Sequence, residues 1–84
     1  MRAEISIQIQ NRYAKEIINS LKVDNINIPK GMEIEMNYNE NCADIKISME
    51  ISSPKDILTL RNTADEILEH ANLAINILEN KRIA

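Results

Sequence analysis

Two side chains in this sequence have the chemistry of a nucleophile or a metal ligand, namely the only histidine, His70, and the only cysteine, Cys42. A metal site needs several convergent ligands, and no second His or Cys is spaced to assist His70. A nucleophile needs a neighbouring base, and nothing in the spacing pairs Cys42 with His70. Cys42 opens a predicted strand, where a small apolar filler is the usual role. We therefore predict that the chain is not an enzyme and holds no catalytic residue, no metal and no cofactor.

The remaining polar residues give no specific catalytic pattern either. Gly31 is the single glycine, so neither a P-loop nor a dinucleotide fingerprint can form. Acidic side chains dominate the polar face of the predicted sheet, and pairs of them could bind a cation, although a solvated face is the simpler interpretation. The polar side chains of this face are Glu4, Ser6, Gln8, Glu33, Glu35, Asp44, Lys46, Ser48 and Glu50.

Composition limits the class of protein and its partners. The 84 residues suffice for one domain, predicted as residues 1–84. The net charge of −3 and the presence of only two aromatic residues disfavour a general nucleic-acid binder. A single thiol suits a reducing compartment. No apolar run approaches the roughly 20 residues that span a bilayer. We expect a cytoplasmic protein that does not contact membranes.

Hydrophobic periodicity predicts five elements. Alternating apolar residues indicate three strands, and apolar residues on one helical face indicate two helices. The second helix has a clear start, because Ser53, Pro54 and Asp56 form a Ser-Pro-x-Asp capping pattern. Asn11 is the predicted N-cap of the first helix. The predicted strands are residues 3–9, 32–38 and 43–51, and the predicted helices are residues 12–22 and 54–80; residues 23–31 form a loop and 39–42 a hairpin turn.

These elements predict an α+β fold, a two-layer β-α-β-β-α sandwich. All three strands alternate, so one face of the sheet is apolar and both helices cover it. A right-handed crossover makes the first two strands parallel, and the third lies between them, antiparallel to both, in the order 1-3-2. The outer strands are then unpaired edges that a partner could cover. The pattern is ferredoxin-like without its fourth strand.

The long second helix carries more apolar residues than one face needs. Its expected sheet-facing stripe is Ile57, Leu60, Ala64, Ile67, Leu68, Ala71, Ala74, Ile75 and Leu78. At about 1.5 Å per residue the helix spans roughly 40 Å, against about 30 Å for a nine-residue strand, so its last two turns should overhang the sheet. Leu58, Leu73 and Ile77 lie outside the stripe. Apolar side chains on a protruding helix predict contact with another chain, although a frayed tail would carry them as well.

A basic row lies along the outer face of the first helix. Arg12, Lys15 and Lys22 are spaced by three and seven residues. A solvated helix face is the default interpretation, and contact with an RNA backbone is the functional one. Glu16 dilutes the row.

Three short segments resemble a known family. Ser20–Asn25 looks like the Ser-Leu-x-Pro-Asp/Glu-Asn segment that closes the first helix of the Pcc family, with Val23 in place of the proline. The strand pair 34–36 and 44–47 is similar to that of the family. Asp56–Arg61 looks like its Asp-x-x-x-Leu-Arg helix opening. Asp65 and Glu66 stand where family members often have Asn-Ser. Length and element order also agree over nearly the whole chain.

The resemblance implies a function. Pcc proteins are the small dimerising subunit of the archaeal and eukaryotic KEOPS complex, which makes threonylcarbamoyladenosine in tRNA. The chemistry belongs to the metal-dependent threonylcarbamoyl-transferase subunit, onto which each half of a Pcc homodimer docks through helices, and the dimer contributes to tRNA binding. On this basis we expect a non-catalytic, homodimeric scaffold of archaeal type. The choice between a homodimer and a heterodimer with a diverged second copy stays open.

The resemblance also suggests site residues. The predicted docking residues, for the dimer or the transferase, are Tyr13, Ile17, Leu58, Leu73 and Ile77. The predicted tRNA contacts are Arg12, Lys15, Lys22 and Arg61, and Arg61 could instead pair with Asp65 at i,i+4.

The alternative function is a stand-alone nucleic-acid-binding or transcription-associated module, which would bind RNA or DNA without partners. A ligand-binding domain would instead need convergent polar groups in a cavity.

Overall fold

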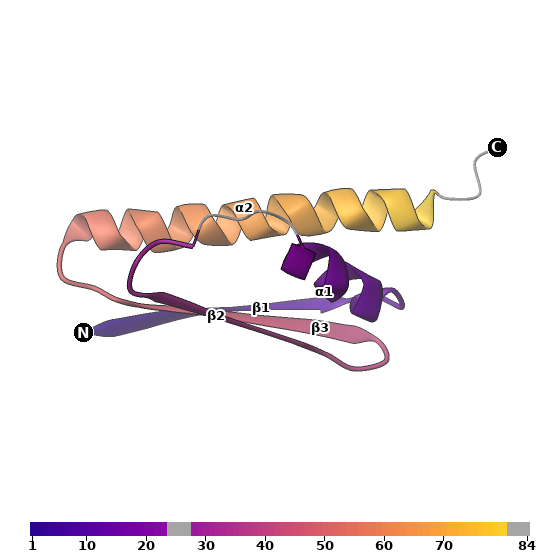
Figure 1. Ribbon diagram of the computed structural model, residues 1–84, viewed down its shortest axis with the longest axis horizontal. Helices are drawn as coiled ribbons and strands as arrows, with labels where there is room; N and C mark the ends of the chain where they lie inside the picture. Colours follow the sequence, from indigo (N-terminus) through magenta and orange to yellow (C-terminus); the bar gives the residue numbers. More distant parts are fainter. Residues whose placement is uncertain (24–27, 81–84) are drawn as a thin grey trace.

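The computed structural model describes residues 1–23 and 28–80, and its elements follow the order β-α-β-β-α. The elements are β1 (Arg2–Gln10), α1 (Ala14–Val23), β2 (Met32–Tyr38), β3 (Cys42–Glu50) and α2 (Pro54–Glu79). The sheet order is β1-β3-β2, with β3 antiparallel to both neighbours. Both helices lie on one face of the sheet, and α2 runs along its whole length (Figure 1). The predicted fold class is confirmed. Residues 24–27 of the predicted loop, which include the last two residues of the Ser20–Asn25 segment, lie outside the described residues.

The core lies between β3 and the two helices. Ala43, Ile45, Ile47 and Met49 alternate along β3 and are all buried. The helices cover them with Ile17, Ile18 and Leu21 of α1 and with Leu60, Ala64, Ile67 and Ala71 of α2. The apolar side chains of the edge strands are less enclosed, since Ala3, Ile5, Ile9, Ile34 and Met36 are half-buried. The central strand is therefore fully covered, whereas both edges keep exposed apolar surface.

Local hydrogen bonds fix where the elements begin. The Asp56 carboxylate accepts the backbone N–H groups of Ser52 and Ser53 at 2.8 and 3.2 Å, which starts α2 as predicted. Asn11 accepts the N–H of Tyr13 on its side chain at 2.8 Å, and α1 begins at Ala14, slightly later than expected. Gly31 has a φ of 85°, which a side chain would disfavour, and it completes the turn that leads into β2.

Helix α2 and strand β1 run side by side and are tied together at both ends. At one end, the N–H of Ile51, just before α2, donates to the carbonyl of Met1 at 2.6 Å. At the other end, the side-chain amide of Asn11 donates to the Glu79 carboxylate at 3.1 Å.

The predicted stripe on α2 needs two corrections. Ile57 and Leu68 were placed on the sheet-facing side, but Ile57 is 53% exposed and Leu68 is 38% exposed. Thr63 is buried instead, and its hydroxyl donates to the carbonyl of Thr59 at 3.0 Å, which satisfies the polar group within the helix. The stripe is rotated because α1 lies beside α2 and buries a flank that the sheet alone would leave open.

The last two turns of α2, which were predicted to overhang the sheet, pack beside α1. Ala74 is buried and Leu78 is half-buried, because α1 fills the space next to them. The Asn11–Glu79 hydrogen bond also holds the helix end to the chain that leaves β1. The first helix thus supports the part of α2 that the sheet does not reach.

The core predicts unequal costs for two apolar truncations on α2. Ile67→Ala removes a fully buried side chain and should lower the free energy of unfolding by about 2–5 kcal/mol. Leu58→Ala removes an exposed side chain from the same helix and should change it by less than about 0.5 kcal/mol. Urea titrations followed by circular dichroism measure both values, and equal costs would contradict this packing.

Candidate functional site

A shallow apolar groove runs between α1 and the C-terminal half of α2. Its walls are Glu16 and Ser20 of α1 and Ala74, Ile77 and Leu78 of α2, and its volume is about 170 Å³. The spacing of each wall reflects helix geometry, because residues three or four apart share one face. The groove exists because α1 is shorter than α2 and only partly covers its flank. A groove between two helices is the shape that accepts a third helix with apolar anchors.

One predicted docking residue, Ile77, lines this groove, and a second, Leu73, precedes it by one helical turn. Ile77 is 70% exposed on its rim, and Leu73 is 56% exposed one turn earlier on the same flank of α2. Contiguous apolar side chains that face water mark an interaction surface. We call Leu73, Ile77 and the groove residues the helix groove.

The other three predicted docking residues are placed differently. Ile17 is fully buried in the core, so its prediction as a docking residue is wrong: the face of α1 that carries it packs on the sheet. Tyr13 is half-buried against the core just before α1. Leu58 is exposed on the solvent side near the start of α2, about 22 Å along the helix from Leu73, and is not part of the helix groove.

The basic row is solvent-exposed, as expected for a helix surface. Arg12, Lys15 and Lys22 are all exposed, and the guanidinium of Arg12 lies 5.0 Å from the ring centroid of Tyr13, a cation–π distance. Arg61 is not part of this row. It lies on α2, where its Nε is 3.9 Å from Asp65 Oδ2, so Arg61 forms the i,i+4 ion pair that was the alternative to a tRNA contact.

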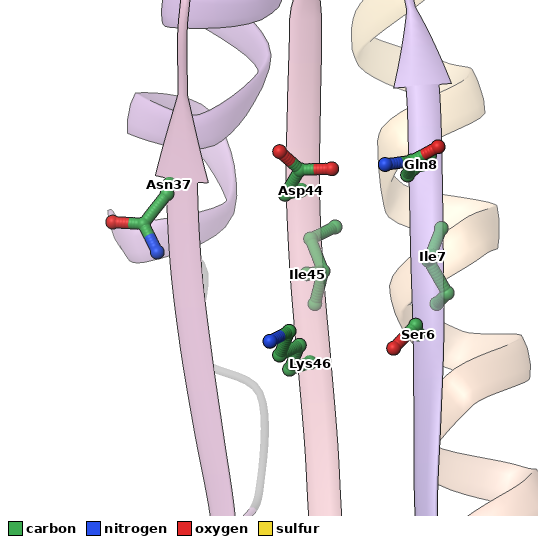
Figure 2. A pocket seen from close by; sticks show the side chains of 7 residues that line it. All are labelled: Ser6, Ile7, Gln8, Asn37, Asp44, Ile45 and Lys46. Carbon is green, nitrogen blue, oxygen red and sulfur yellow. The ribbon is translucent and has the colours of Figure 1, made fainter.

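The open face of the sheet carries a shallow polar depression of about 310 Å³. Figure 2 shows Asn37, Asp44 and Gln8 in one row across β2, β3 and β1, with Lys46 and Ser6 in the next row. The strand register explains the rows, because Asp44 pairs with both Gln8 and Asn37, and Lys46 pairs with Ser6. The opposite end of the face is closed by ion pairs from Met1 to Glu50 and from Arg2 to Glu33.

Cys42 lies at the border of this depression. Its thiol is 3.8 Å from Asp44 Oδ1 and half-buried. Desolvation, followed by the negative charge and hydrogen bond of Asp44, raises the pKa of the Cys42 thiol. A raised pKa keeps the thiol protonated and lowers its nucleophilicity at neutral pH. His70 lies half-buried on α2, away from Cys42 in the sequence and on a different layer of the fold.

Two further features of the described residues bear on function. Over residues 1–23 and 28–80, no three or more His, Cys, Asp or Glu side chains are grouped to hold a metal ion. In the same part of the chain, neither helix combines the length and apolar character needed to cross a membrane.

The family described as "Transcription factor Pcc1" matches residues 2–79. The chain belongs to the Pcc1 family. This is the family of the small subunit of the KEOPS complex, so the predicted family is confirmed. No curated protein matches the chain closely. The match includes every described strand and helix.

The match also covers the helix groove, which sequence reasoning found only in part. In this Pcc1 protein the off-stripe positions Leu73 and Ile77 were recognisable from spacing. Glu16, Ser20 and Ala74 were not recognised, because their role depends on how α1 lies against α2. No local sequence signal sets that lateral placement.

The surroundings of Cys42 predict a pH-dependent reactivity. Asp44→Asn removes the charge and the acceptor that add to the raised pKa, so the thiol pKa should fall and alkylation near pH 8 should become severalfold faster. Iodoacetamide rates measured between pH 7 and pH 10 test this. Asp65→Asn, which changes an exposed acid on α2, is the matched control and should leave the rates unchanged. An unaltered rate profile in Asp44→Asn would exclude the electrostatic effect.

Proposed function

We propose that this Pcc1-family chain is a non-catalytic scaffold subunit of a KEOPS complex. In this role it forms a dimer in the cytoplasm, docks the threonylcarbamoyl-transferase subunit and assists threonylcarbamoylation of tRNA adenosine. Family membership supports the assignment to KEOPS. The observation that carries the docking role is the helix groove, in which Leu73 and Ile77 face water beside a cleft between two helices.

The shape of the helix groove favours an α-helical ligand. Leu73 and Ile77 are four residues apart, the spacing at which side chains on neighbouring helices interlock. Helices of the transferase subunit would pack against both α1 and α2 and bury these side chains. Glu16, on the opposite wall, would face the polar rim of such an interface.

Truncating the exposed side chains should abolish docking without unfolding the chain. We expect the double variant Leu73→Ala/Ile77→Ala to keep its circular dichroism spectrum and to bind the transferase at least tenfold more weakly, since each side chain is exposed in the free protein. Isothermal titration with the transferase subunit from the same genome measures the affinity. Leu58→Ala removes an equally exposed leucine outside the groove and should bind normally. Unfolding of the double variant, or unchanged affinity, would place the docking surface elsewhere.

The basic row supports a minor role in tRNA binding. Arg12, Lys15 and Lys22 are exposed cations on α1 and just before it, whereas the open sheet face is mainly acidic. Phosphate contacts made by lysine and arginine weaken as the salt concentration rises, because releasing counterions from the nucleic acid then gains less free energy. The row would therefore supplement, and not replace, the tRNA contacts of the other subunits.

Neutralising the row should weaken tRNA binding by the assembled complex. We expect Lys15→Ala and Arg12→Ala each to reduce the slope of log affinity against log salt by about one unit or less. Filter binding across a salt series measures this slope. Lys46→Ala removes a cation from the acidic sheet face and should leave the slope unchanged. Equal slopes for all variants would remove the basic row from the tRNA interface.

A second candidate function follows from the description of the family as a transcription factor. A stand-alone nucleic-acid-binding module would bind DNA or RNA without partners, with affinity that falls steeply with salt. The net charge of −3 and the acidic sheet face oppose it. Measurable affinity of the isolated chain for duplex DNA at physiological salt would favour this second function over the scaffold.

A further inference from the structure

Strand β2 leaves one edge of the sheet open. Its outer edge has no neighbouring strand in the described part of the chain. All seven residues pair with β3 in one continuous register, from Met32 with Met49 to Tyr38 with Ala43, so no bulge interrupts the strand. The strand contains no proline and no lysine. A regular edge of this kind is a template for a further strand.

Two hydrogen bonds show which backbone groups of β2 point outward. The N–H of Ile51 donates to the carbonyl of Met1, which continues the β1–β3 register, so the odd-numbered residues of β3 bond to β1. The N–H of Asn39 donates to the carbonyl of Cys42 at 2.9 Å, so the even-numbered residues of β3 bond to β2. In an antiparallel pair every second residue is bonded, and the residues between direct their N–H and C=O groups away. On β2 the residues with outward groups are Met32, Ile34, Met36 and Tyr38.

Most of the outward N–H groups have no acceptor among the described residues. The N–H of Met32, at the start of the strand, donates to the carbonyl of Pro29 at 3.2 Å. The N–H groups of Ile34, Met36 and Tyr38 form no hydrogen bond with any described residue. An incoming strand would therefore meet three donors that the sheet already holds in line, which is the arrangement used in recognition by strand addition.

The two sides of β2 offer different contacts. On the side of the helices, Ile34 and Met36 are only half-buried, so apolar surface remains at the edge. The side chains of β2 on the open face are all exposed and polar, namely Glu33, Glu35 and Asn37. Side chains alternate between the two faces along a strand. A further strand would thus meet apolar side chains on its helix side and acidic ones on its open side.

Glu35 selects the charge of such a strand. The carboxylate of Glu33 already forms an ion pair with Arg2, which reaches it from β1 across β3. Glu35 is exposed at the centre of β2 and forms no ion pair with a described residue, although Lys46 is its partner in the register. A residue directly opposite Glu35 on a new strand would occupy a non-hydrogen-bonded position, where facing side chains are closest. A basic residue is favoured there and an acidic one is disfavoured.

The same residue argues against a second copy of this chain at the β2 edge. Pairing two β2 strands about their common centre gives the longest overlap, and it would place Glu35 directly opposite its own symmetry mate. Like charges that face each other across a strand pair are destabilising. The charge of the edge therefore favours a different chain that supplies a cation.

We propose that the β2 edge binds an extended segment of another protein as an additional strand, antiparallel to β2. In this pairing a basic side chain of the segment lies opposite Glu35, and apolar side chains lie opposite Ile34 and Met36. The recognised pattern is therefore apolar-basic-apolar in an extended conformation. The proposal goes beyond the scaffold function and does not depend on it, because no residue of the helix groove belongs to β2.

A symmetrical heptapeptide carries this pattern. In acetyl-Thr-Thr-Val-Lys-Val-Thr-Thr-amide the valines would face Ile34 and Met36, and the lysine would face Glu35. We expect NMR titration of the full-length chain to show binding, with slower hydrogen exchange at the N–H groups of Ile34, Met36 and Tyr38. Replacing the lysine of the peptide by glutamate should weaken binding at least about fivefold. Absence of binding at millimolar peptide, or chemical-shift changes confined to β1 or the helices, would overturn the proposal.

Charge reversal in the protein distinguishes a specific contact from general attraction. Glu35→Lys should reverse the preference, so that the glutamate peptide binds more tightly than the lysine peptide. Glu4→Lys makes the same change on the open face of β1 and should keep the preference for lysine. Both substitutions change an exposed side chain, so the circular dichroism spectrum should stay the same. An equal response of the two variants would reduce the effect to net charge and exclude the contact with Glu35.

N-methylation of the peptide tests the strand pairing itself. The valine N–H groups would donate to β2, whereas the lysine N–H would point away from it. Methylating both valine nitrogens should abolish binding, and methylating the lysine nitrogen should preserve it. Binding that survives methylation of the valines, or an equal loss from both modifications, would show that the peptide is not held as a strand and would contradict the proposal.

Discussion

The structure depends on covering the apolar face of β3. Four alternating side chains of this strand are removed from water, and two helices are needed to cover a sheet of three strands on one side. Apolar burial contributes roughly 25 cal/mol per Å², so the covered centre supplies most of the stability. Because β3 is in the middle, the lateral surfaces of β1 and β2 are what the helices cover least. Covering β3 therefore produces a stable centre and leaves the edge strands β1 and β2 less covered.

Much of the fold could be predicted from the sequence, because alternation and capping are local signals. The strand limits moved by one residue or less, and α2 began at Pro54 as the capping pattern indicated. The errors on α2 have a physical origin. Ile57 and Leu68 were placed on the sheet because helical periodicity gives the width of an apolar stripe without its rotation. The rotation is decided by how α1 lies beside α2, which is a tertiary property. Ile17 was predicted as a docking residue from the family resemblance, although it is fully buried.

The candidate site was predictable to the same extent. Leu73 and Ile77 stood out because they lie off the apolar stripe, a signal that does not depend on the neighbouring helix. Leu58 gave the same signal, yet it lies about 22 Å along the helix from Leu73, outside the helix groove. The groove beside Leu73 and Ile77 could not be predicted, because it depends on where α1 lies against α2. Periodicity thus finds surplus apolar residues but does not say which of them act together.

The apolar residues of α2 fall on surfaces that point in different directions. One side contacts the sheet through Leu60, Ala64 and Ile67, and the adjacent side meets α1. Ile57 and Leu68 are exposed on another side of the helix. A chain of 84 residues buries only about 60–65% of its unfolded surface, so its folded state is marginally stable. Apolar side chains that stay exposed add nothing to that stability. Their retention on two separate flanks is explained if each flank is covered by a different partner. Leu73 and Ile77 lie on the side of α2 roughly opposite Ile57 and Leu68, so a partner in the helix groove would leave Ile57 and Leu68 accessible.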